Sequence, residues 1–132
     1  MSVSGPTGYA LNRNRHAYLA THLRIAKTHW SRFRGLMCID SISFPTGQGL
    51  WIVPARGVHT FAMRFPIDVV YLSREKIVVH MEQNLKPWHV APIRMRAASV
   101  LELPSQTLSS TGTVIGDEIE IALGQVGKTG QA

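Results

Sequence analysis

Short hydrophobic segments alternate with turn-forming residues along most of this chain. In residues 17–26, Leu19 and Leu23 fall on one face of an extended strand, and polar residues fall between them. Clusters of Pro, Gly, Ser and charged residues separate such segments at roughly regular intervals of 8 to 15 residues, which is typical of β proteins. The pattern predicts strands at 17–26, 50–53, 57–63, 67–72, 77–82, 100–103 and 118–123.

One stretch has helical periodicity instead. Trp30, Phe33 and Met37 are spaced so that all three lie on one face of a helix. Thr28 stands in front of them as a suitable N-cap. We therefore predict one short α-helix near 28–37.

Together these elements predict a mainly β single domain, built as an antiparallel sandwich or barrel. The chain has 132 residues, of which 45% are hydrophobic, enough for one domain with its own core. We expect the domain to cover residues 17–123. Residues 1–16 read as a flexible basic tail, residues 124–132 as a second flexible tail, and residues 105–111 as a helical turn.

The formal charge of +6 is concentrated near the N-terminus. Residues 1–34 contain six Arg and Lys residues and no Asp or Glu, whereas in residues 35–132 eight basic and eight acidic residues cancel. This segment could bind an anionic surface or simply form a solvated face. Its aromatic residues do not form a stacking array, so nucleic acid is not favoured as a partner.

The sequence also limits the compartment. No run of about 18 apolar residues is present, so we expect no membrane span. Cys38 is alone, which excludes an internal disulfide. The first residues lack the pattern of a secretory signal. We therefore expect a cytoplasmic protein; the sequence does not predict its oligomeric state.

Several polar side chains interrupt the most hydrophobic strands. His59 and Asp68 lie in such segments, and Glu102 is enclosed in Val-Leu-Glu-Leu. Polar groups in a small interior require hydrogen-bond or charge partners, so they form either a binding site or a structural network. Trp88 lies in a Pro-rich loop, where an exposed aromatic ring suits ligand or peptide binding. The candidate ligand-binding residues are Arg34, His59, Thr60, Arg64, Asp68, Trp88 and Glu102.

Five sequence blocks carry a resemblance to a known family. They are RGLM at 34–37, GLW at 49–51, HTFAMRFPID at 59–68, VLELP at 100–104 and GD at 116–117. In this order and at these separations, the chain resembles the bacterial and archaeal "domain of unknown function 192" over most of its length. The resemblance implies a compact, mainly β domain of jelly-roll-like or sandwich type with a short helix after the first strand. It implies no activity.

Two functions from different classes remain open. The preferred one is a non-catalytic accessory module that binds a small ligand or a protein in a polar cleft around His59, Asp68 and Glu102. The alternative is a small hydrolase or isomerase with His59 as base and Asp68 or Glu102 as its acidic partner. A third, weaker interpretation is anionic-surface binding through the basic N-terminal segment. The six His residues include no metal-binding spacing, and no cofactor motif is present, so we expect neither a metal nor a cofactor.

Overall fold

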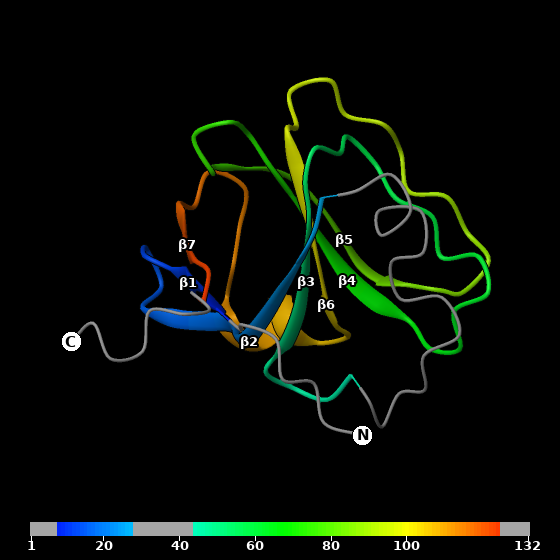
Figure 1. Ribbon diagram of the computed structural model, residues 1–132, viewed down its shortest axis with the longest axis horizontal. Coiled ribbons are helices and arrows are strands. Elements are labelled where there is room, and N and C mark those ends of the chain that lie inside the picture. The colour runs from blue at the N-terminus through cyan, green and yellow to red at the C-terminus, as the bar shows by residue number, and fades with distance from the viewer. Residues whose placement is uncertain (1–7, 28–43, 125–132) are drawn as a thin grey trace.

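Seven strands form one continuous curled sheet in the computed structural model, which describes residues 8–27 and 44–124 (Figure 1). The strands lie in the order β5-β4-β6-β3-β2-β1-β7, and one short helix, α2, contacts β2. The helix predicted near 28–37 lies outside the described residues. The elements are β1 (Gly8–Asn12), β2 (Ala17–Ala26), β3 (Gln48–Ile52), β4 (Ile67–Leu72), β5 (Val78–Leu85), β6 (Ser99–Pro104), α2 (Thr107–Thr111) and β7 (Ile119–Ala122).

Most of the predicted strands are confirmed, and the bounds of β2 and β4 match the prediction. The helical turn predicted at 105–111 is confirmed as α2. The strand predicted at 57–63 is wrong. In this segment His59 pairs with Val90 as a single bridge, and Ala62 has a φ of 59°, a left-handed conformation that cannot continue an extended strand.

The mainly β prediction is confirmed, but the fully antiparallel, jelly-roll-like sandwich is wrong, and the predicted barrel is only half formed. β2 and β3 run parallel, with Leu23 beside Gly49, while the other neighbouring strands are antiparallel. Parallel pairing requires a long connection, and residues 27–47 lie between these two strands. The outer strands approach each other at one end, where Ile77 and Glu118 form a single bridge. The sheet is therefore a half-barrel and not two packed sheets.

The flexible tail predicted for residues 1–16 is wrong for its second half, because residues 8–12 form β1 between β2 and β7. Ala10 is completely buried there. A Cβ atom on Gly8 would lie 1.9 Å from the carbonyl oxygen of Ala122, so this close approach of two backbones requires glycine. Periodicity missed β1 because the strand is short and its partner β7 lies at the other end of the chain.

Two hydrophobic cores lie on opposite faces of the sheet. Every residue of β4 and β6 is buried, so both faces of these strands are covered. In β4, Val70 and Leu72 belong to the first core, and Val69 and Tyr71 belong to the second. Leu108 of α2 packs in the first core. This two-sided burial explains why both strands are continuous apolar runs in the sequence.

Two loops, residues 53–66 and 86–98, cover the second core and lie side by side in Figure 1. Phe65 of the first loop and Ala97 of the second are buried in that core. The hydroxyl of Tyr71 donates a hydrogen bond of 2.6 Å to a carbonyl oxygen of the 86–98 loop. Burial raises the pKa of Tyr71 to about 12, so the hydroxyl stays protonated and holds the loop to the sheet.

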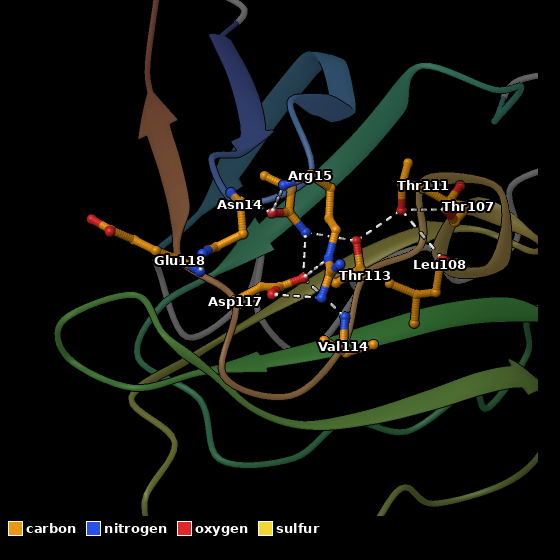
Figure 2. A network of polar contacts seen from close by, with 10 residues as sticks. Asn14, Arg15, Thr107, Leu108, Thr111, Thr113, Val114, Asp117 and Glu118 are labelled. Atoms are coloured by element: carbon orange, nitrogen blue, oxygen red, sulfur yellow. Dashed lines mark hydrogen bonds and ion pairs between the residues drawn. The ribbon is translucent and has the colours of Figure 1, made fainter.

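A polar network joins the end of β1 to the turn that precedes β7 (Figure 2). The buried Asn12 side chain donates hydrogen bonds to Thr113 (3.0 Å) and to Asp117 (2.9 Å). Arg15 also donates to Asp117, with 3.1 Å between Nε and Oδ2. Burial acts to raise the pKa of Asp117, but hydrogen bonds from Asn12, Val114 and Arg15 outweigh it and hold the pKa below its usual value.

Replacing Asp117 should destabilise the protein in a pH-dependent way. We expect Asp117→Asn to lower the free energy of unfolding by about 1–3 kcal/mol near neutral pH, because a neutral amide with one acceptor oxygen replaces the carboxylate that accepts from Asn12, Val114 and Arg15. A depressed folded-state pKa contributes stability above the unfolded pKa, and this contribution is lost as the pH falls through the folded pKa. The difference from wild type should therefore shrink in acid, as measured by urea unfolding. Glu118→Gln, which removes a neighbouring exposed carboxylate, is the control; an equal effect of both substitutions would contradict the role of the network.

Candidate binding site

The polar residues predicted to line one cleft are spread over different parts of the structure. Glu102 of β6 lies opposite Val69 of β4, and its neighbour Leu103 lies opposite Asp68. Residues paired across antiparallel strands share a face, while successive residues alternate. Asp68 and Glu102 therefore project from opposite faces of the sheet, and His59 lies in a loop. The structure does not bring these three side chains into one cleft.

Asp68 uses both carboxylate oxygens to accept backbone hydrogen bonds. Oδ1 accepts from the amide of Asn84 in β5 (2.9 Å), and Oδ2 accepts from the amide of Leu108 in α2 (2.8 Å). The residue is 1% exposed. Because both oxygens bind the backbone of neighbouring elements, Asp68 ties β5 and α2 to β4.

Glu102 is buried in the face of the sheet that carries the second core. It lies between Leu50 of β3 and Val69 of β4 and is 2% exposed. Its Oε1 has no hydrogen-bond partner among the described residues. Burial raises the pKa of Glu102 to about 8, so the side chain is mainly a neutral acid at pH 7.

Thr60 connects the two loops that cover the second core. Its hydroxyl donates to the carbonyl oxygen of Lys86 (2.6 Å) and accepts from the amide of His89 (2.7 Å). Its backbone amide donates to the carbonyl oxygen of His89, and its carbonyl oxygen accepts from the amide of Trp88. Thr60 is completely buried, so these bonds fix the two loops as one unit.

Aromatic rings stack on the outer side of this connection. The ring centroids of His59 and Phe61 are 4.9 Å apart, and those of Phe61 and Trp88 are 6.1 Å apart. Trp88 has a left-handed backbone, with φ of 64°, and is 67% exposed. A bulky residue rarely adopts this conformation unless surrounding bonds impose it, and here the bonds to Thr60 do so.

A groove with a volume of about 850 Å³ lies between the 53–66 and 86–98 loops. Apolar side chains make up most of its wall, and three cationic or titratable side chains, Arg56, His59 and Arg74, also line it. Among the described residues that line the groove, none is Asp or Glu. The apolar side chains of the wall are Pro54, Ala55, Val58, Phe61, Val90, Ala91, Ile93, Met95, Ala97 and Ala98.

The predicted ligand-binding residues lie in different positions relative to the groove. Of the predicted residues, His59 lines the groove, Trp88 and Arg64 are exposed on the same two loops, and Thr60 lies beneath them. Arg34 lies outside the described residues. Sequence reasoning missed Arg56, Arg74, Ile93 and Met95. The alternation of apolar and basic residues in Ile-Arg-Met-Arg at 93–96 was the available signal.

No three His, Cys, Asp or Glu side chains within residues 8–27 and 44–124 are arranged to hold a metal ion. In the same ranges, no helix has the length and apolar character needed to cross a membrane.

Comparison with known families confirms the predicted resemblance. A model of the family DUF192, described as "Uncharacterized ACR", matches residues 10–121. A UPF0127 protein of Thermococcus sibiricus is 27% identical over 115 residues, which cover 83% of this chain and 72% of that protein. A UPF0127 protein of Pyrococcus furiosus is 28% identical over 115 residues, which cover 83% of this chain and 95% of that protein.

Solved structures share the fold at low sequence identity. A protein of unknown function from Novosphingobium aromaticivorans has a TM-score of 0.74 and 18% identity, covering 91% of this chain and 89% of that one. A Sinorhizobium meliloti protein described as a "putative transcription regulator" has a TM-score of 0.73 and 20% identity. The match covers 92% of this chain and 96% of that one. These similarities establish the fold alone.

Removing the Thr60 hydroxyl should separate the two loops. We expect Thr60→Val to lower the free energy of unfolding by about 1–3 kcal/mol, because the amide of His89 and the carbonyl of Lys86 lose their hydrogen-bond partner in the interior. Thr60→Ser keeps the hydroxyl and should retain most of the stability. Denaturant unfolding of the three proteins measures the effect. Equal stability of Thr60→Val and wild type would contradict the role of this hydrogen bond.

Replacing Glu102 with a neutral residue should change how stability depends on pH. The folded-state pKa of about 8 lies above the ordinary value of 4.5, so wild type should lose stability as the pH rises between these values. From about pH 5 to pH 8 we expect a loss on the order of a few kcal/mol relative to Glu102→Gln.

Urea unfolding at several pH values measures this difference. Glu75→Gln removes an exposed carboxylate in a turn and serves as the control, which should follow wild type. A parallel pH profile for wild type and Glu102→Gln would show that Glu102 is not buried as an unpaired acid.

Proposed function

The chain belongs to the DUF192 family, and we propose that this member is a binding module that holds a small amphipathic anion in the groove between its 53–66 and 86–98 loops. The observation that carries the proposal is the composition of the groove: two arginines and a histidine within an apolar wall that contains no carboxylate among the described residues. An apolar body and an anionic group on one ligand would match both features.

The size of the groove supports a small-molecule ligand. Pockets that hold such ligands are typically about 300–1,000 Å³ in volume and mainly apolar, with a few polar groups that fix orientation. The groove, at about 850 Å³, falls within this range. Val58, Phe61 and Met95 offer apolar contact area for the ligand body.

The charges of the groove favour an anion. Arg56 and Arg74 are both exposed. No ion pair joins either side chain to another residue within the described ranges. Guanidinium groups bind carboxylate or phosphate groups through two parallel hydrogen bonds. An anionic ligand would therefore gain directional contacts without displacing an existing carboxylate.

Binding is a better supported function than acid–base catalysis. Neither of the carboxylates considered as a partner for His59 lines the groove. Asp68 already accepts two backbone hydrogen bonds, and Glu102 projects into the second core. His59 lines the groove, and its ring accepts a hydrogen bond from the amide of Phe61 and stacks on the ring of that residue. We therefore assign His59 to ligand contact and not to catalysis.

Octanoate and 1-octanol test this proposal, because they share a chain and differ in charge. Chemical-shift titrations of the labelled full chain should show saturable binding of octanoate at the groove. The double variant Arg56→Gln/Arg74→Gln should weaken octanoate binding by about tenfold or more, as expected when charge-assisted hydrogen bonds are lost. It should leave 1-octanol binding unchanged, whereas Met95→Gln should weaken both.

Arg24→Gln is the matched control, because Arg24 is an exposed arginine of β2 outside the groove. It should bind both ligands as wild type does. The proposal fails if octanoate does not bind saturably, or if the double variant and Arg24→Gln bind octanoate equally.

A further inference from the structure

The 53–66 and 86–98 loops form a strongly basic surface. Residues 53–66 and 86–98 contain five Arg and Lys residues and no Asp or Glu. All five side chains are exposed. We call the outer surface of these two segments the loop face. Its basic residues are Arg56, Arg64, Lys86, Arg94 and Arg96.

Large apolar side chains are exposed among these charges. Trp88, Ile93 and Met95 are 67%, 68% and 73% exposed, and Val90 is exposed to a similar degree. Ile93, Arg94, Met95 and Arg96 alternate along a single segment of backbone. Large contiguous apolar surface on a folded protein usually marks a binding site.

Backbone hydrogen bonds fix the loop face in place. The amide of Ala91 donates to the carbonyl oxygen of Val58 (2.9 Å), and the amide of Arg94 donates to that of Arg56 (2.9 Å). The bonds to Thr60 connect the same two loops further along. The apolar and basic side chains are thus held together before any partner arrives, which lowers the entropic penalty of binding.

The combination of exposed groups identifies the partner chemistry. Aromatic and aliphatic side chains at loop tips enter the headgroup region of a bilayer, while neighbouring Arg and Lys side chains contact anionic phosphate groups. Single-stranded nucleic acid would use stacked rings and basic residues but would leave Val90, Ile93 and Met95 without a role. We propose that the loop face docks this protein on the surface of anionic lipid bilayers, as a peripheral contact.

This proposal goes beyond ligand binding in the groove. Trp88, Lys86 and Arg96 belong to the loop face and do not line the groove, whereas Arg74 lines the groove and lies outside the two segments. Variants of Trp88, Lys86 and Arg96 therefore test membrane docking, and a variant of Arg74 tests ligand binding in the groove. A variant that loses one of these two activities can still be measured for the other. The loop face also differs from the basic N-terminal segment, which the sequence suggested as an anionic-surface site.

Co-sedimentation of the full chain with large unilamellar vesicles tests the docking. Vesicles of phosphatidylcholine with about 30 mol% phosphatidylserine are compared with phosphatidylcholine alone at low and high salt. We expect binding to the anionic vesicles only, weakened by salt. Each basic residue near an anionic surface contributes about fivefold to the partition constant, so Lys86→Gln/Arg96→Gln should lower it by at least tenfold. Trp88→Ala should lower it independently.

Two variants act as controls. Arg13→Gln/Arg24→Gln removes the same charge from the β1–β2 region, and Arg74→Gln alters the groove; both should bind vesicles like wild type. The proposal is overturned if anionic vesicles do not bind, if Arg13→Gln/Arg24→Gln weakens binding as much as Lys86→Gln/Arg96→Gln, or if neutral vesicles bind equally well. Binding of an oligothymidylate through Trp88 and Lys86 without vesicle binding would also overturn it and identify nucleic acid as the partner.

Discussion

The hydrogen bonds of Thr60 are the contacts on which the rest of the surface depends. The 53–66 and 86–98 loops have no regular secondary structure, yet they cover one face of a sheet whose central strands must be buried on both sides. The hydroxyl of the buried Thr60 joins the loops, because it donates to one carbonyl and accepts from one amide of the 86–98 loop. Together with the backbone bonds from Ala91 to Val58 and from Arg94 to Arg56, this connection holds the cover of the second core in one piece.

The polar residues of the interior divide into three kinds by the partners they find. Asp68 of β4 accepts hydrogen bonds from two backbone amides, one in β5 and one in α2, and so connects these three elements. Asp117 is held as a carboxylate by Asn12 and Arg15 at the end of β1. Glu102 has an oxygen without a hydrogen-bond partner among the residues that the structure describes, and burial raises its pKa, so it remains in the second core as a neutral acid. The burial of these three acidic residues therefore does not mean that they belong to one functional site.

The apolar pattern of the sequence predicted the strands whose position depends on their own side chains. Apolar alternation and continuous apolar runs placed β2 and β4 correctly, because each strand buries its own side chains. The parallel pairing of β2 with β3 and the insertion of residues 8–12 depend on partners distant in the chain, which periodicity cannot reveal. The same limit applied to the site. His59 and Trp88 were recognised as unusual residues, but only register shows that Asp68 and Glu102 face apart. Only the folded structure places Arg56 and Arg74 in the wall of one groove.

The groove and the loop face both require that the two loops form one ordered surface in the free protein. Amide hydrogen exchange measures this directly at the amides of Thr60, His89, Ala91 and Arg94, each of which donates a hydrogen bond between the loops. Local opening would expose these amides independently of the sheet. We expect these four amides to exchange together and with strong protection in the absence of any ligand. Rapid exchange at these four positions, while the amides of β4 and β6 stay protected, would contradict this expectation.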